Sequence, residues 1–248
     1  MKPEVHVLPD PEAIFQRAAD EFSRLAIEAV KARGVFFVAL SGGSTPKGLY
    51  TLLVSDPSFR AQVPWDKIHF FFGDERTVPP EHADSNFRMA TEAMFSKVTV
   101  PAAHIHRVSG EDSLPSRAAA AYEQELRNAF DLSEGQFPRF DLILLGMGPD
   151  GHTASLFPGT TALQEKSRLV VANWVEKFKT YRITFTFPVL NNAANILFMA
   201  GGAEKAEVLK SVLNNDPAAA PYPSQLVHPQ NGRLLWLVEQ AATRLWQG

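Results

Sequence analysis

Apolar residues recur every three to four positions between residues 10 and 33, which predicts an amphipathic helix. The apolar positions of this stretch are Ile14, Ala18, Phe22, Leu25, Ala29 and Val30. Asp10 can cap the first turn, Pro11 suits the first helical position, and Gly34 is a residue that commonly ends a helix. We therefore expect the first helix to span residues 10–33.

A continuous apolar run follows at residues 35–40, and it is rich in aromatic and β-branched side chains. Such a short run is typical of a strand that is buried on both faces of a sheet. The strand leads into segment 41–45, which contains glycine and serine, and Pro46 stands where we expect the next helix to begin. The pattern indicates a strand, a tight turn and a helix in succession.

The same arrangement recurs at two further places along the chain. Residues 68–72 form a second apolar run that ends in the polar segment 73–76. Residues 140–145 form a third, which ends in the glycine-rich segment 146–152, and residues 153–157 are predicted to begin a helix that packs onto the sheet. Each of the three strands therefore leads into a polar loop that contains glycine.

The rest of the chain continues the alternation of helices and strands. Further helices are predicted near residues 85–95, 116–130 and 203–213, and further strands near 168–172, 181–187, 195–200 and 233–238. This alternation predicts an α/β fold with a doubly wound, mostly parallel sheet flanked by helices. We expect one domain over residues 1–248, with the proline-rich segment 216–229 as a surface connection. Because ligands bind beyond the carboxyl ends of the strands in such sheets, the three loops should meet in one crevice.

Composition and charge argue against several classes of function. The 24 Lys and Arg residues against 27 Asp and Glu residues give a net charge of −3, without runs of like charge. We therefore expect no nucleic-acid partner and no membrane surface as partner, and any anionic ligand must be held by a local site. The chain contains no cysteine, which excludes thiolate nucleophiles and cysteine-ligated metals and fits a reducing compartment. The first ten residues lack the apolar core of a signal peptide, so we expect a cytoplasmic protein.

The first loop has the features of a phosphate-binding turn. It consists of Ser41, Gly42, Gly43, Ser44 and Thr45, between a buried strand and a helix. The glycines allow a tight turn that exposes backbone N–H groups, and the hydroxyls and the helix N-terminus add further donors. This combination suits a phosphate monoester, and the alternative interpretation is a plain strand-to-helix turn.

Three other motif interpretations fit the sequence less well. Gly48 is followed by leucine rather than lysine, which argues against a nucleoside triphosphate loop. Residues 39–43 approach the nucleophile motif of serine hydrolases, but no upstream strand is predicted that would supply the oxyanion loop of that fold. Residues 146–151 match the dinucleotide-binding pattern, yet the next predicted strand ends in Asn173 and lacks the required acidic residue.

The third loop presents an acid and a histidine to the expected crevice. Asp150 and His152 bracket a glycine at the carboxyl end of a buried strand. An imidazole in this position can act as a general base, and a carboxylate beside it can orient the ring and stabilise its charged form. We therefore predict a histidine base, with Asp150 or Asp74 as the acid that orients it.

The second loop adds a cation and two acids. Arg76 can bind a phosphate or an oxyanion, and Asp74 can accept hydrogen bonds from sugar hydroxyls, although a surface ion pair is the simpler interpretation. Ser85 is expected to cap the next helix. Arg182 and Lys205 begin a predicted strand and a predicted helix, and each alone reads as a surface cation.

Two histidines form a weak metal-binding pattern. His104 and His106 alternate with Ile105, which places both imidazoles on one face of a predicted strand. A catalytic metal site needs a third ligand, and none stands nearby in the sequence. We therefore expect no metal.

Five segments together resemble the 6-phosphogluconolactonase family. They are SGGSTP at 41–46, GDERTVPP at 73–80 with SN at 85–86, GMGPDGHTASLFPG at 146–159, RITFTFP at 182–188 and GGAEKA at 201–206. The resemblance implies a Rossmann-like fold of the sugar-phosphate isomerase type. It implies hydrolysis of 6-phospho-D-glucono-1,5-lactone to 6-phosphogluconate in the oxidative pentose phosphate pathway, without a metal or an organic cofactor. We also expect no obligate protein partner.

The resemblance also implies roles for individual residues. His152 matches the family's catalytic base, Asp150 stands beside it, and Arg76 matches the arginine held over the substrate. The residues expected to bind the phosphate and the rest of the substrate are Ser41, Gly42, Gly43, Ser44, Thr45, Asp74, Arg182 and Lys205. The base would activate a water for attack at C1 of the lactone.

Three alternative functions remain in view. A glucosamine-6-phosphate deaminase or isomerase would share the fold, but that family carries a glutamate where this chain has Phe157. A catalytically silent sugar-phosphate sensor would not need a base beside an acid. A serine hydrolase would use Ser41 as its nucleophile.

Overall fold

A six-stranded parallel sheet forms the centre of the protein, with strand order β1-β9-β8-β5-β2-β3. The computed structural model describes residues 3–215 and 221–246 of the chain. The strands are β1 (Glu4–Leu8), β2 (Phe36–Leu40), β3 (Ile68–Phe72), β5 (Leu142–Gly146), β8 (Asn195–Ala200) and β9 (Arg233–Glu239). All pairings in this sheet are parallel, which confirms the predicted fold class.

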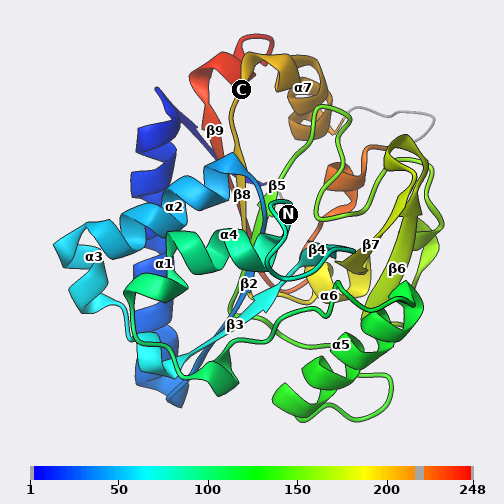
Figure 1. Cartoon of the computed structure of the whole chain (residues 1–248). Helices are drawn as coiled ribbons and strands as arrows, with labels where there is room; N and C mark the ends of the chain where they lie inside the picture. The colour runs from blue at the N-terminus through cyan, green and yellow to red at the C-terminus, as the bar shows by residue number, and fades with distance from the viewer. Residues whose placement is uncertain (1–2, 216–220, 247–248) are drawn as a thin grey trace.

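Helices flank the sheet on both sides (Figure 1). They are α1 (Pro11–Arg33), α2 (Ser44–Ser55), α3 (Pro57–Gln62), α4 (Asn86–Ala93), α5 (Pro115–Ala129), α6 (Phe187–Asn191) and α7 (Ala206–Asn214). Figure 1 shows α1, α2 and α4 to the left of the sheet and α5 to its right. Within the described residues, none of the helices is long and apolar enough to cross a bilayer.

The first helix follows its sequence signals closely. The Asp10 carboxylate accepts a hydrogen bond from the backbone N–H of Ala13 at 2.8 Å, Pro11 opens the helix, and Gly34 ends it with φ at 79°. The second helix differs slightly from the prediction, because α2 begins at Ser44 rather than at Pro46. The N-terminal strand β1, which pairs with β9 at the edge of the sheet, was not predicted.

A second, smaller sheet corrects the expectation that nearly all strands join one parallel sheet. Strands β4 (Asp74–Arg76), β7 (Thr180–Phe185) and β6 (Val170–Val175) form an antiparallel sheet in the order β4-β7-β6. The strands predicted near 168–172 and 181–187 therefore exist, but they belong to this second sheet and not to the central one. Only a short link separates β6 from β7, and a short link can join antiparallel strands but not parallel ones.

Two local predictions were wrong. Residues 153–157 begin no helix: Thr153 and Leu156 pair in an isolated bridge, and Ala154 adopts a left-handed φ of 47°, which a helix does not accommodate. His104 ends a short 3₁₀ turn instead of lying on a strand. The predicted surface connection 216–229 lies partly outside the described residues, and its described part contains a 3₁₀ turn at Pro223–Leu226.

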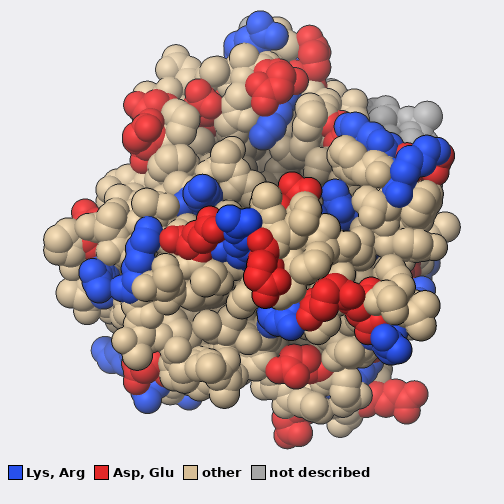
Figure 2. Space-filling model, viewed as in Figure 1, with Lys and Arg blue, Asp and Glu red and all other residues tan. Residues whose placement is uncertain are grey.

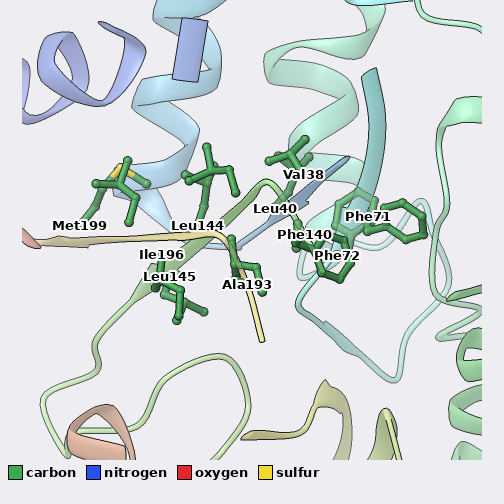
Figure 3. Packing of buried hydrophobic residues seen from close by; sticks show 14 of the residues in the cluster. Val38, Leu40, Phe71, Phe72, Phe140, Leu144, Leu145, Ala193, Ile196 and Met199 are labelled. Atoms are coloured by element: carbon green, nitrogen blue, oxygen red, sulfur yellow. The ribbon is translucent and has the colours of Figure 1, made fainter. Parts of the chain in front are cut away.

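The core explains why the strand sequences are continuously apolar. Leu144 and Leu145 are both fully buried, and Figure 3 shows them extending to opposite faces of β5. Val38 and Leu40 of the neighbouring strand are also fully buried. Because both faces of the sheet are covered, no polar position is needed along these strands.

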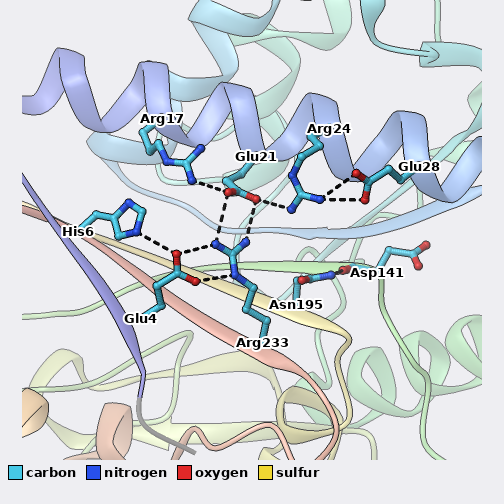
Figure 4. Close-up of polar contacts among 9 residues, drawn as sticks. All are labelled: Glu4, His6, Arg17, Glu21, Arg24, Glu28, Asp141, Asn195 and Arg233. Carbon is cyan, nitrogen blue, oxygen red and sulfur yellow. Dashed lines mark hydrogen bonds and ion pairs between the residues drawn. The ribbon is translucent and has the colours of Figure 1, made fainter.

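An ion-pair network joins the first helix to the edge of the sheet (Figure 4). The Arg233 guanidinium on β9 lies 2.9 Å from a Glu21 carboxylate oxygen on α1 and 2.8 Å from a Glu4 oxygen on β1. The Glu21 side chain is only 4% exposed. Because Glu4 and Arg233 begin their strands, the network lies at the end of the sheet opposite to the carboxyl ends.

Candidate active site

A cavity of about 340 Å³ opens at the carboxyl ends of β2, β5 and β8. The chain places β3 on one side of β2 and β5 on the other, and in open α/β sheets ligands bind at such a reversal of strand order. The three polar loops meet there. The sequence-predicted residues that line the cavity are Ser41, Gly42, Gly43, Ser44, Thr45, Asp74, Arg76, His152, Arg182 and Lys205.

Asp150 lies behind His152 and contacts its ring. The Asp150 Oδ1 and the His152 Nδ1 are 2.5 Å apart, which leaves Nε2 as the ring nitrogen available to the cavity. Burial raises the pKa of the Asp150 carboxyl, but the hydrogen bonds and charges of His152 and Lys177 outweigh burial and hold this pKa below its ordinary value. The carboxylate therefore stays ionised beside the imidazole and can stabilise its protonated form.

Gly148 makes this pair possible. A β-carbon at position 148 would lie 2.1 Å from the His152 ring and 2.9 Å from the Asp150 carboxylate, so no other residue fits without moving the ring. The Gly148 N–H donates to the His152 carbonyl at 2.9 Å, which closes the loop around the pair. The glycine-rich sequence thus allows close packing of Asp150 and His152.

The structure shows which of the two acids contacts the histidine. Asp74 is buried and accepts a 2.6 Å hydrogen bond from the Ser155 hydroxyl, and the Asn86 amide donates to the Asp74 carbonyl at 2.9 Å. Asp150, not Asp74, contacts His152. Asp74 instead lines the cavity wall as a fixed hydrogen-bond acceptor.

An aromatic ring packs against the imidazole. The rings of Phe157 and His152 stack with centroids 4.1 Å apart and planes 21° apart. Phe157 is buried, so it limits rotation of the imidazole from one face while Asp150 holds its edge. The tight turn at Thr153–Leu156, in place of the predicted helix, brings Phe157 back onto the ring.

The first loop is held in a shape that suits an anion. The Tyr50 hydroxyl donates to the Ser41 carbonyl at 2.9 Å and accepts from the Ser41 N–H at 3.0 Å, which fixes the end of β2. Gly43 has a φ of 106°, and a β-carbon on Gly42 would lie 1.9 Å from the Asn86 side chain. Because α2 begins at Ser44, the unpaired N–H groups of its first turn lie at the cavity.

Three cations complete the cavity wall. Arg76 and Arg182 are directly paired positions on β4 and β7, and Lys205 precedes α7. Burial, and then the charge of Arg76, lowers the pKa of Arg182, and burial lowers the pKa of Lys205. Arg182 and Lys205 thus lie where their own charge is disfavoured, and a bound anion would relieve that cost. Acidic and basic residues intersperse over the face in Figure 2, so this cationic character is local.

Comparisons with known proteins show which family the chain belongs to. The family model of glucosamine-6-phosphate isomerases and 6-phosphogluconolactonases matches residues 9–236. The chain belongs to this family. It is 46% identical over 242 residues to the 6-phosphogluconolactonase of Nostoc sp. and 42% identical over 242 residues to that of Synechocystis sp., with 98% of each chain covered. A solved 6-phosphogluconolactonase structure from Thermotoga maritima is 33% identical, has a TM-score of 0.81, and covers 96% of this chain and 100% of its own.

Several residues of this member of the isomerase and lactonase family were not predicted to belong to the site. Phe157, Phe178 and Ser155 line the cavity, and Lys177 contacts Asp150. The spacing of Phe157 from His152 was an available signal, because the resemblance implies a glutamate at that position in the deaminases. Lys177 and Phe178 lie on the link between β6 and β7, and no local pattern indicates that this link reaches the site.

The remaining predictions outside the cavity have mixed outcomes. Ser85 caps α4 as expected, because its hydroxyl accepts from the Arg88 N–H at 3.1 Å. His106 lies 2.6 Å from a Glu125 carboxylate oxygen and 2.9 Å from the His69 ring. Among the described residues, no group of three or more histidine, aspartate or glutamate side chains is arranged to hold a metal ion.

Proposed function

We propose that this chain hydrolyses 6-phospho-D-glucono-1,5-lactone to 6-phospho-D-gluconate, a step of the oxidative pentose phosphate pathway. The observation that carries the proposal is that His152, paired with Asp150, lines one cavity together with Arg76, Arg182 and Lys205. A base and a phosphate-binding set within one cavity are what a sugar-phosphate lactone requires. The names of the relatives at 46% and 42% identity support the same activity.

The proposed reaction needs one base and no covalent intermediate. His152, in its neutral form, takes a proton at Nε2 from a water molecule, and the oxygen of that water forms a bond to C1 of the lactone. The tetrahedral intermediate collapses as the bond from C1 to the ring oxygen breaks, and the imidazolium returns the proton to that oxygen. Asp150 keeps the second ring proton on Nδ1 and stabilises the imidazolium.

The other residues bind and orient the substrate in this proposal. Arg76 or the loop N–H groups stabilise the negative charge that develops on the carbonyl oxygen during attack. The phosphate is held by the 42–45 turn, Arg182 and Lys205, all of which line the cavity. Binding energy from the distant phosphate then fixes the lactone ring against His152.

The experiment that tests the proposal is hydrolysis of freshly prepared 6-phosphogluconolactone, coupled to 6-phosphogluconate dehydrogenase. The spontaneous rate is measured without protein and subtracted, and glucosamine 6-phosphate is assayed in parallel for ammonia release. We expect a large protein-dependent rate on the lactone and none on the amino sugar. Absence of a rate above the spontaneous one contradicts the proposal, and ammonia release would assign the chain to the deaminase side of the family.

The lactone is the partner that we propose, and the cytoplasm is the location. The proposed location rests on the cysteine-free composition, which fits a reducing compartment.

A further inference from the structure

A lysine outside the predicted site reaches the catalytic pair. Lys177 belongs to the β6–β7 link, which is residues 176–179, and its Nζ lies 3.1 Å from the Asp150 Oδ2. The other carboxylate oxygen of Asp150, Oδ1, faces His152. The two oxygens of one carboxylate are thus divided between an imidazole and an ammonium group.

Phe178, the residue after Lys177, packs the β6–β7 link against residues of the cavity. The Phe178 ring meets the Phe157 ring edge to face with centroids 5.7 Å apart, and the Arg182 guanidinium lies 5.5 Å from the Phe178 ring. The Lys177 Nζ also lies 5.5 Å from the Phe178 ring. Phe178 lines the cavity, so the link that carries Lys177 lies beside the site.

We propose that Lys177 is a positioning residue, which fixes the Asp150 carboxylate and sets how tightly His152 holds its proton. The inference rests on the proposed function, because it concerns the base of that reaction. With both oxygens engaged, rotation of the carboxylate away from the His152 Nδ1 must also break the ion pair with Lys177. The positive charge of Lys177 also opposes a second positive charge on the imidazole, so it favours the neutral ring that acts as a base.

Other charged groups line the same cavity as His152. Arg76, Arg182 and Lys205 line the cavity on other elements and oppose the imidazolium in the same direction as Lys177, whereas Asp74 favours it. Tyr222 packs against Gly151. Of the cations, Lys177 is the one whose ion pair with Asp150 is seen directly.

The test compares Lys177→Met with Lys179→Met in the full-length protein. Both changes remove one exposed positive charge from the β6–β7 link, but Lys179 pairs with Glu176 and not with Asp150. Removing Lys177 strengthens the pull of Asp150 on the imidazole proton. We expect the acid limb of the kcat/KM profile to move to higher pH by about 0.3 to 0.7 unit, the size of an exposed ion pair. Lys179→Met should leave the limb in place, and Lys177→Arg should restore it.

A second measurement does not depend on turnover. The NMR titration of the His152 ring protons, assigned by their loss in His152→Ala, should show the same upward shift in Lys177→Met. Added salt should move the wild-type midpoint toward that of the variant, because an exposed pair is screened. Equal midpoints in the wild type, Lys177→Met and Lys179→Met overturn the inference. A wild type without lactonase activity instead contradicts the proposed function, and the NMR comparison still decides the role of Lys177.

Discussion

At the scale of single residues, two glycines shape the site because they have no side chain. Gly148 leaves room for the Asp150–His152 contact, and Gly42 leaves room for the Asn86 amide that holds the Asp74 backbone. Neither requirement comes from a turn alone, because the nearest obstructing atoms belong to His152 and Asn86, whose side chains line the cavity. Glycine at these positions is therefore a condition for the site geometry.

Replacing the proposed base tests its role directly. We expect His152→Ala to lower kcat by at least about 10²-fold, the typical loss on removal of a general base, with an unchanged melting temperature. The exposed His82 lies outside the cavity, so His82→Ala serves as the matched control. A His152→Ala variant that retains normal kcat in the coupled assay would remove His152 from the mechanism.

We expect a methyl group added at Gly148 to lower activity, and one added at Gly135 to lower stability. Because this β-carbon would meet the His152 ring at 2.1 Å, Gly148→Ala is expected to displace the base and lower kcat by about 10²-fold. Gly135→Ala is the contrasting variant, since its φ of 79° strains an alanine while nothing lies within 4 Å of the new carbon. It should lose stability but keep its kcat. Equal activity in the two variants contradicts this account of Gly148.

At the scale of elements, the ends of the central sheet have different tasks. The carboxyl ends carry the cavity, while Glu21, Glu4 and Arg233 join α1, β1 and β9 at the amino ends. This network fixes an edge strand that pairs with one neighbour only. The ion pairs that stabilise the fold and the polar residues that line the cavity thus lie at opposite ends of the strands.

The ion-pair network should make stability depend on pH through Glu21. Burial raises the pKa of this carboxyl, but the hydrogen bonds from Arg24 and Arg233 outweigh burial and keep the pKa below its ordinary value of 4.5. Because the folded pKa is lowered, the contribution of Glu21 is complete above pH 4.5 and is lost as the pH falls through the folded value.

We therefore expect Glu21→Gln to lower the free energy of unfolding at pH 7 by about 2 kcal/mol, because it breaks a largely buried pair. Urea denaturation should show this difference shrinking toward pH 3. The exposed Glu28 pairs with Arg24 on the same helix, and Glu28→Gln should change the free energy by less than about 0.5 kcal/mol. A pH-independent difference for Glu21→Gln would contradict the argument.

At the scale of the whole molecule, the cavity is assembled from residues between Ser41 and Lys205. They come from both sheets and from loops that are far apart in the sequence. Such a cavity exists only in the folded chain. Any ligand that fills it must therefore stabilise the fold.

Thermal unfolding with 6-phosphogluconate tests this coupling. At about 100 times its dissociation constant, the product should stabilise the protein by about 2.7 kcal/mol, which corresponds to a melting temperature about 5 to 10 °C higher for a chain of this size. Lys205→Met should lose most of this shift at the same concentration. Lys210 is exposed on α7, so Lys210→Met should keep the shift. An equal shift in both variants would exclude Lys205 from the binding set.

The sequence by itself determined the central sheet and the position of the loops. Runs such as 35–40 and 68–72 are apolar throughout because both faces of the sheet are covered, and this burial leaves a local signal. The loops follow from it, because parallel strands place their carboxyl ends at one edge. Asp150 and His152 could be proposed as a pair because they are two residues apart in one loop.

Only the tertiary structure decided which distant residues meet. The antiparallel sheet that contains β6 and β7, the stacking of Phe157 on His152 and the contact of Lys177 with Asp150 were all absent from the prediction. These contacts depend on how loops and elements pack in three dimensions. Nothing in the residues next to Lys177 in the sequence indicates a contact with Asp150, which lies 27 positions away. A residue pattern reports burial and local conformation, whereas the partner of a side chain is set by the packing of the whole chain.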